Sequence, residues 1–123
     1  MRGQRLFIRP LDPRDHDAIR HFLDLHLHPA PVPAAGIVGK LVGDLVAVAA
    51  MELTGDAIRL DDLFVAPDLR RKRVGRFMVD ELASLAAKMD REWVVVEQPC
   101  GAQEFLRKTG FVERGERWER RVR

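Results

Sequence analysis

The sequence predicts a single mixed α/β domain of the α+β class, in which a mostly antiparallel, twisted sheet is flanked by helices. Three features support this fold class. Three apolar runs separated by tight turns occupy residues 37–66, apolar residues recur at helical spacing over residues 74–89, and residues 93–96 are continuously apolar. A meander of strands is therefore expected to lead into one long helix, which crosses over to a buried strand.

The chain opens with a short predicted strand, residues 6–8, which Pro10 closes. Asp12 and Pro13 are of the residue types preferred at the N-cap and the first position of a helix. Apolar residues at helical spacing extend this helix over residues 13–27, and three prolines then end it. The linker that follows is expected to be extended.

The middle of the chain is typical of an antiparallel meander. Residues 37–42 and 45–53 are expected to pair across a turn at Gly43 and Asp44. Residues 54–56 form a second predicted turn, and residues 57–66 form the third strand.

The second half alternates between helices and strands. The long helix is expected to bury one face, made up of Val74, Met78, Leu82, Leu85 and Met89 and widened by Phe77 and Ala86. After the buried strand, residues 102–108 are predicted to form a two-turn helix that ends at Gly110. Residues 111–114 and 117–122 then form a hairpin around Gly115 and Glu116.

The composition fits one globular domain, expected to span residues 1–123. Apolar residues make up 46% of the chain, and a single cysteine, Cys100, excludes an internal disulfide. The apolar runs are too short for a bilayer span or a signal peptide, so the expected location is cytoplasmic, with no membrane partner. Basic residues cluster at 70–73 and 114–123, which favours an anionic partner.

A strand, a basic loop and a helix follow one another between residues 60 and 76. The first turn of a helix carries unpaired N–H groups and a partial positive charge, so it readily binds phosphate. The four cations at 70–73 add full charges, and Gly75 would let a ligand approach the backbone closely. These features favour pyrophosphate or another polyanion, against the alternative of a loop that is only solvated.

This segment resembles motif A of the GCN5-related N-acetyltransferase (GNAT) family, in which Val-x-Pro precedes Arg/Gln-x-x-Gly-x-Gly/Ala at the start of a helix. Val65-Ala-Pro67 and the stretch from Arg70 to Gly75 lie at the family's spacing. Ile8-Arg-Pro10 resembles part of the family's opening strand, and residues 102–111 resemble its late motif. The resemblance covers most of the chain and implies the family's fold, with two central strands splayed apart.

The resemblance also implies that acetyl-CoA, or a similar acyl-CoA, binds between the splayed strands as co-substrate, without a metal. Its implied binding residues are Leu63, Phe64, Val65, Arg70, Arg71, Lys72, Arg73, Val74, Gly75 and Arg76. The strand residues would offer backbone groups to the pantetheine arm, and the loop would wrap the pyrophosphate. The implied reaction is direct attack of a primary amine on the thioester, with the oxyanion held by a backbone N–H near Val65.

Two residues depart from the family pattern. Arg73 stands at the motif's first glycine, where its side chain would crowd the phosphates or contact them, and where a positive φ would penalise arginine. Leu106 stands where the family usually has the tyrosine that protonates the departing thiolate, and the chain contains no tyrosine. Either water, Cys100 or another group supplies that proton, or the protein binds or senses acyl-CoA without efficient turnover.

Two carboxylates are candidates for the general base that deprotonates the amine. Glu97 follows the strand at residues 93–96, where some family members place their base. Asp61 alternates with Leu63 and Val65 and is expected to share their face of the strand, whereas Asp62 points the other way. The alternative for both candidates is a salt bridge with nearby arginines.

Other features give weaker predictions. The four histidines lie between residues 16 and 28 and are interpreted as surface residues rather than metal ligands. The basic cluster also fits a nucleic-acid contact, although few aromatic residues adjoin it. Trp118 is expected in the core or in a homodimer contact. The short linker at residues 29–36 suggests an open acceptor site, suited to a small amine, a peptide or a protein.

Overall fold

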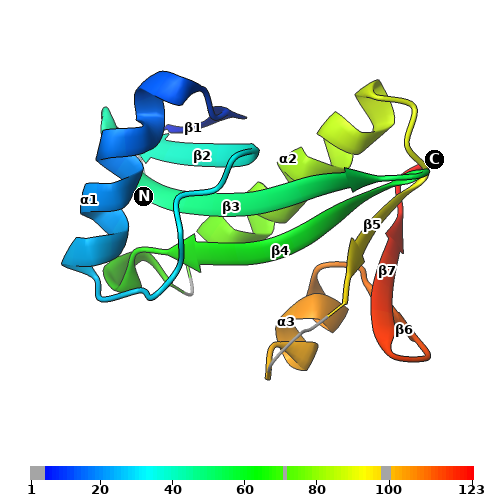
Figure 1. Cartoon of the computed structure of the whole chain (residues 1–123). Helices are drawn as coiled ribbons and strands as arrows, with labels where there is room; N and C mark the ends of the chain where they lie inside the picture. The colour runs from blue at the N-terminus through cyan, green and yellow to red at the C-terminus, as the bar shows by residue number, and fades with distance from the viewer. Residues whose placement is uncertain (1–4, 71, 98–100) are drawn as a thin grey trace.

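The computed structural model describes residues 5–70, 72–97 and 101–123, which form a seven-stranded mixed sheet in the order β1-β2-β3-β4-β5-β7-β6 (Figure 1). The strands are β1 (Leu6–Pro10), β2 (Gly36–Leu41), β3 (Asp44–Thr54), β4 (Ala57–Val65), β5 (Trp93–Val96), β6 (Val112–Arg114) and β7 (Arg117–Arg121). Neighbouring strands are antiparallel except for β4 and β5, which run parallel.

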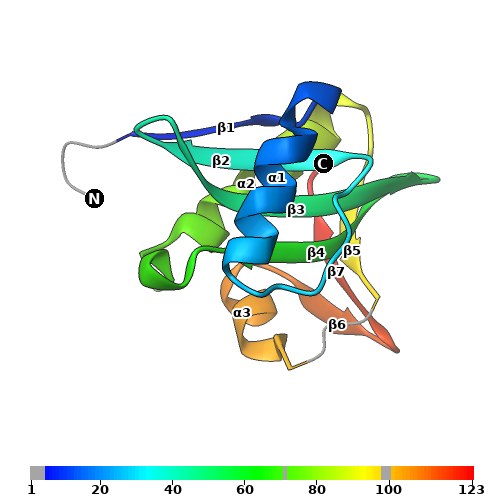
Figure 2. The ribbon, with the colours of Figure 1, turned by 60° about the vertical axis from the view of Figure 1, so that its left-hand side comes forward.

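Two helices cover opposite faces of this sheet (Figures 1 and 2). Helix α1 (His16–Leu25) packs on one face, where Ile19, Phe22 and Leu23 join a core with residues of β2, β3 and β4. Helix α2 (Val74–Lys88) packs on the other face with Ile58 and Val94 among its core neighbours. The short helix α3 (Gln103–Lys108) joins this second core through Leu106. In the described part of the chain, no helix is both long and apolar enough to cross a membrane.

A partly buried ion pair fixes the start of α1 to the sheet. Asp12 caps the short 3-10 turn Pro13–Asp15, and the Asp15 carboxylate accepts a hydrogen bond from the Asp12 backbone N–H, which completes a capping box. Asp15 also accepts two hydrogen bonds from the Arg9 guanidinium of β1, at 2.7 and 2.8 Å. These bonds hold the pKa of Asp15 well below its usual range.

The order of elements and the antiparallel meander are as the sequence predicts, and two local details differ. Helix α1 ends at Leu25, before Leu27, which has a positive φ of 55°. The turn between β2 and β3 is centred on Val42 and Gly43, at φ 51° and 82°, so Asp44 already belongs to β3. Two positive φ values suit a tight hairpin because they match the twist of the flanking strands.

The buried face of α2 is also rotated from the predicted one. Phe77 is 44% exposed, while Val79 and Ala83 are buried beside Met78 and Leu82. A helix that packs on a broad sheet buries a wide stripe, and small residues such as Ala83 enter it where the helix and strands approach closely. Trp118 is buried within the single chain, which confirms the core alternative for this residue.

Strands β4 and β5 pair over a short stretch and then separate. Their parallel register runs from Ala57 opposite Trp93 to Arg59 opposite Val95, whereas β4 continues to Val65. Beyond Arg59, β4 therefore keeps β3 on one edge and has no pairing with β5 on the other. Figure 1 shows the two strands diverging toward α3. The predicted splay between central strands is confirmed.

Candidate functional site

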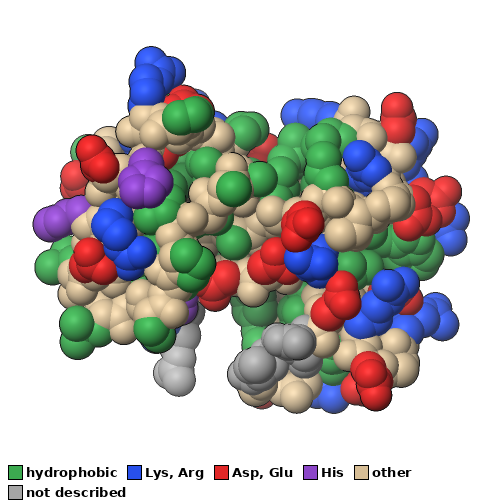
Figure 3. All heavy atoms as spheres, in the orientation of Figure 1, with side chains coloured by type: hydrophobic (Ala, Val, Ile, Leu, Met, Phe, Trp, Pro, Cys, Tyr) green, Lys and Arg blue, Asp and Glu red, His purple; other side chains and the backbone are tan. Residues whose placement is uncertain are grey.

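A hollow of about 370 Å³ lies where β4 and β5 begin to separate, and Arg59, Leu60, Asp61 and Glu97 line it. Both carboxylates predicted as candidate bases thus reach the same hollow, although they are 36 residues apart in the sequence. Figure 3 shows acidic side chains gathered around a basic one near the middle of this face of the molecule.

Arg59 organises the charges of this hollow. Its Nε donates a hydrogen bond to Asp61 Oδ1 at 2.6 Å, and its guanidinium also contacts Glu52. Glu97 Oε1 lies further away, 3.9 Å from Arg59 Nη1. The hydrogen bond and charge of Asp61 raise the pKa of Arg59 above its ordinary value. The predicted alternative of salt bridges with arginine therefore holds, more closely for Asp61 than for Glu97.

A β-bulge changes the orientation predicted for Asp61. In the ladder with β3, Asp62 pairs with Ala50 and Leu60 pairs with Met51, which leaves Asp61 without a partner on β3. The extra residue interrupts the two-residue alternation that would place Asp61 on the face of Leu63 and Val65. Its carboxylate turns to Arg59 instead.

The open edge of β4 presents backbone groups in an alternating pattern. The Ala66 N–H donates to the Val46 carbonyl of β3 at 2.8 Å. Because successive residues turn their backbone groups to opposite edges, those of Val65 and Leu63 face away from β3, whereas those of Phe64 face β3. Of these three residues, Leu63 and Val65 offer backbone groups to the gap, whereas Phe64 does not. The Phe64 side chain packs against α1.

The basic loop leads from this edge to the start of α2. A 3-10 turn, Pro67–Leu69, follows β4, and Arg73 forms the N-cap of α2 with φ 66° and ψ 8°. The first hydrogen bond of the helix runs from the Phe77 N–H to the Arg73 carbonyl at 2.9 Å. The N–H groups of Val74, Gly75 and Arg76 precede it and, by their position in the first turn, have no intrahelical partner.

The predicted penalty at Arg73 is therefore present in the structure, because its backbone adopts the left-handed conformation that favours glycine. The side chains of Lys72, Arg73 and Arg76 are exposed around the helix start. Arg71, also predicted in this loop, lies outside the described residues, as does Cys100.

Arg70 connects the loop to the open edge of β4. Its Nε donates a hydrogen bond to the Val65 carbonyl at 3.2 Å, and its guanidinium carbon lies 5.3 Å from the centre of the Phe64 ring. This cation–π contact and hydrogen bond hold a positive charge beside the edge. In this arrangement Arg70 occupies one of the backbone acceptors that face the gap.

Leu106 lies in the core, with 2% of its surface exposed, and so offers no polar group to the gap. The chain contains no tyrosine that could replace it from another position. No group of three or more metal-ligating side chains comes together among the residues the structure describes.

One contact near this site has no signal in the sequence. His28, in the segment after α1, contacts Asp62 of β4, with His28 Nε2 and Asp62 Oδ2 2.8 Å apart. His28 is thus only partly a surface residue, since its side chain is 23% exposed and contacts Asp62. These two residues are 34 positions apart, and their spacing matches no motif. Their contact follows from the fold and has no signal in the order of residues.

The sequence matches a known family model, that of the acetyltransferase (GNAT) domain, over residues 34–113, more than half of the chain. No curated protein matches the chain.

Solved structures share the whole fold at low sequence identity. The ribosomal-protein-S18-alanine N-acetyltransferase of Escherichia coli is 15% identical, with a TM-score of 0.75 over 96% of this chain and 94% of that one. YhhK of Escherichia coli, bound to coenzyme A, is 18% identical, with a TM-score of 0.71 over 95% and 98%. The PaiA N-acetyltransferase of Thermoplasma acidophilum, in complex with coenzyme A, is 12% identical, with a TM-score of 0.71 over 95% and 99%.

Proposed function

The chain belongs to the GNAT acetyltransferase domain family, and from this premise we propose that it transfers an acetyl group from acetyl-CoA to a primary amine. The amine attacks the thioester directly, with no covalent intermediate on the protein. The observation that carries the proposal is the separation of β4 from β5 beside the basic start of α2. The acceptor is a small amine or an amino group of a peptide or protein.

The pyrophosphate of the co-substrate is assigned to the first turn of α2. The N–H groups of Val74, Gly75 and Arg76 point out of the helix start, and the exposed cations of the loop surround them. Unpaired amides and the helix dipole both favour an anion at this position. The support is electrostatic as well as geometric, because Arg73 adds a charge where the family motif has glycine.

The pantetheine arm is assigned to the open edge of β4. Leu63 and Val65 turn their backbone groups toward the gap, in the way an edge strand accepts another strand. The Val65 carbonyl is held by Arg70 in the structure, so the arm and Arg70 would compete for this acceptor. A backbone N–H near Val65 would then stabilise the oxyanion as the amine attacks.

The general base of the proposal is Glu97, with Asp61 as the second candidate. A carboxylate whose oxygens are not already engaged in short hydrogen bonds is better placed to contact the attacking amine. Asp61 is bound to Arg59 at 2.6 Å, whereas Glu97 is 3.9 Å from the same group and half-exposed at the hollow. Glu97 is therefore better placed to take the proton of the amine, directly or through a water molecule.

The thiolate leaves without a tyrosine acid in this proposal. A thiol has an ordinary pKa of about 8.5, so a thiolate is a tolerable leaving group near neutral pH even without a proton donor. Water at the open hollow can then protonate it. The expected cost of this arrangement is a lower kcat, because no side chain at position 106 assists departure of the thiolate.

A second candidate function is an acyl-CoA-binding or sensing module with little or no turnover. The buried apolar side chain of Leu106 and the left-handed Arg73 favour it, because both alter positions that the family uses for chemistry and phosphate binding.

One experiment separates these two functions. The protein is incubated with acetyl-CoA and a panel of primary amines, free coenzyme A is followed with a thiol reagent, and acetyl-CoA binding is measured by calorimetry. Thiol release that depends on the amine supports transfer. Micromolar binding without release for any amine favours the sensing module, and no binding at all contradicts both.

A further inference from the structure

The pair formed by His28 and Asp62 lies beside the open edge of β4 but belongs to none of the parts assigned above. We propose that this pair positions the acceptor: the Asp62 carboxylate binds the ammonium group of the incoming amine, and His28 holds that carboxylate in place. The inference rests on the proposed acetyl transfer and adds to it a positioning element on the acceptor side.

Asp62 lies on the section of β4 that β5 has left. The last β4–β5 pair is Arg59 with Val95, three residues earlier. Asp62 pairs with Ala50 of β3, and its side chain turns toward the face covered by α1, as its contact with His28 shows. The core contacts of Leu63 and Val65 lie on the opposite face, with α2. An amine at Asp62 would therefore reach the edge from the face opposite the helix that is assigned to the phosphates.

His28 is held in place by aromatic packing. Its ring stacks on the Phe64 ring, with 4.3 Å between centroids and 26° between planes. Phe64 is in turn fixed edge-on by Phe22 at 5.5 Å. The guanidinium of Arg70 lies over the same Phe64 ring. One buried ring thus adjoins both the basic loop and the His28–Asp62 pair, which places the pair next to the proposed co-substrate site.

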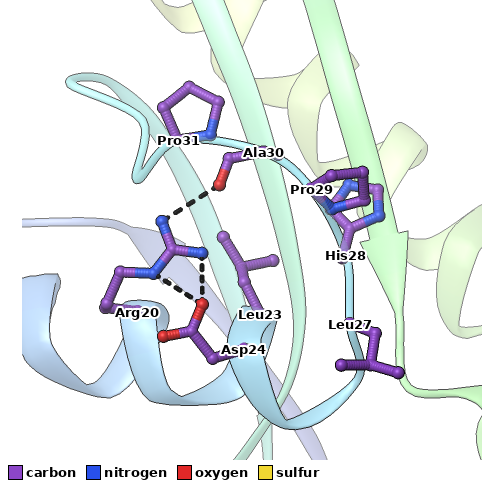
Figure 4. A pocket seen from close by; sticks show the side chains of 8 residues that line it. All are labelled: Arg20, Leu23, Asp24, Leu27, His28, Pro29, Ala30 and Pro31. Carbon is purple, nitrogen blue, oxygen red and sulfur yellow. Dashed lines mark hydrogen bonds and ion pairs between the residues drawn. The ribbon is translucent and has the colours of Figure 1, made fainter.

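The segment that carries His28 is braced from its other side. Arg20 of α1 donates hydrogen bonds to Asp24 and to the Ala30 carbonyl, as Figure 4 shows. The His28 N–H donates to the Leu23 carbonyl at 2.9 Å, so the chain reversal after α1 is fixed on both flanks of the histidine. A histidine on a fixed segment holds its partner carboxylate in one orientation.

Asp62 differs from the other two carboxylates in the group that holds it. Asp61 and Glu97 face the permanent positive charge of Arg59. An imidazole can hold a carboxylate without carrying a permanent charge. Of the two carboxylate oxygens of Asp62, only Oδ2 has a hydrogen-bond partner among the described residues. The Asp62 side chain is 39% exposed. Its second oxygen can therefore accept a charge-assisted hydrogen bond from an ammonium group.

The test measures amine binding apart from turnover. Cadaverine and trialanine, two probes with free ammonium groups, are titrated calorimetrically into the protein with and without desulfo-coenzyme A, which lacks the reactive thiol. Asp62→Asn is expected to weaken probe binding about tenfold, because it removes one charge-assisted hydrogen bond. The affinity for desulfo-coenzyme A is expected to stay within about twofold, since the phosphate site is separate.

Two further variants separate positioning from folding. His28→Ala is expected to weaken probe binding, and His28→Gln, whose amide can still donate to Asp62, is expected to restore most of it. Asp17→Asn removes the same charge from a fully exposed carboxylate of α1, whose ion-pair partner is His16, and is expected to leave probe binding unchanged. Thermal unfolding checks that all variants fold.

The inference is overturned if the wild-type protein binds neither probe at millimolar concentration, or if Asp62→Asn binds them as tightly as wild type. An equal loss in Asp17→Asn also overturns it, since the effect would then come from the general charge of the protein. Failure of acetyl transfer has a different signature: probe binding keeps its dependence on Asp62 while no thiol is released with any amine.

Discussion

The first turn of α2 and helix α3 touch through Gly75 and Phe105, where a Cβ atom on the glycine would lie 3.2 Å from Cε1 of the phenylalanine ring. Carbon atoms in ordinary contact are about 3.5–4.0 Å apart. Gly75 therefore has a packing role between two helices, in addition to any close approach of its backbone to a ligand. This contact fixes where the phosphate-binding turn stands relative to the late part of the chain.

The contact between these residues predicts a coupling that a double-mutant cycle can measure. In a Phe105→Leu background, Gly75→Ala is expected to raise the free energy of unfolding by about 0.5–1 kcal/mol, from helix propensity alone. In the wild-type background the ring opposes this gain, so the two changes should couple by at least about 0.5 kcal/mol. The same cycle with Phe77→Leu is the control, and it should be additive because Phe77 is exposed. Equal coupling in both cycles would contradict the assigned contact.

Replacement of Arg73 by glycine is expected to stabilise the fold. Arg73 has φ 66°, a conformation that costs a non-glycine residue roughly 1–2 kcal/mol. Arg73→Gly should raise the free energy of unfolding by about 1 kcal/mol after the entropy cost of glycine is subtracted. Arg76→Gly, one turn further into the helix, should lower it by about 1 kcal/mol. Urea denaturation measures both variants, and destabilisation by Arg73→Gly would show that the arginine side chain stabilises the loop.

The ion pair between Arg9 and Asp15 is expected to contribute acid-sensitive stability. Because Arg9 lowers the pKa of Asp15 in the folded protein, the contribution is fully present above the unfolded pKa of about 3.9 and is lost as the pH falls through the lower, folded pKa. Arg9→Gln should cost about 1 kcal/mol at pH 7, because solvent partly screens the half-exposed guanidinium, and it should flatten this acid-induced loss. Arg14→Gln, which breaks an exposed pair with Asp12, should change the stability much less than Arg9→Gln does. Urea unfolding from pH 7 to pH 2 checks both.

Glu97→Gln is expected to lower kcat about 100-fold with the amine that gives the fastest thiol release, since it removes the proposed base. Asp61→Asn should lower it by less than about fivefold, because Asp61 is already engaged by Arg59. The kcat values come from the thiol-release assay at saturating acetyl-CoA. The reverse ranking would assign the base to Asp61, and two small effects would leave proton transfer to water.

The sequence contained most of the fold because each element carried its own local signal. The periodicity of α2, the prolines around α1 and the glycines of the hairpins were all readable from the order of residues. The sequence predicts Phe77 on the buried face of α2, whereas its side chain is 44% exposed. Helical periodicity identifies an apolar stripe but does not say which edge of the stripe contacts the sheet. The turn at Val42 was missed because a β-branched residue with positive φ is uncommon, and the tight hairpin forces it there.

The site was less accessible to sequence reasoning than the fold. The bulge that leaves Asp61 without a partner on β3 depends on the register between β3 and β4. The residue type at position 61 gives no information about that register. The contact of His28 with Asp62 depends on where a chain reversal after α1 meets a strand 34 residues later. By contrast, the lack of a tyrosine acid was visible at once, because it is a property of composition.

The short pairing of β4 with β5 has a mechanical consequence. Three residue pairs, with α2 and its core, join the sheet of the N-terminal half to β5, β7 and β6. A ligand seated in the gap would bridge the two halves where strand–strand hydrogen bonds are missing. Part of its binding energy would then hold the two halves of the sheet together. Amide hydrogen exchange in the unpaired ends of β4 and β5 is therefore expected to slow in both strands when the gap is filled.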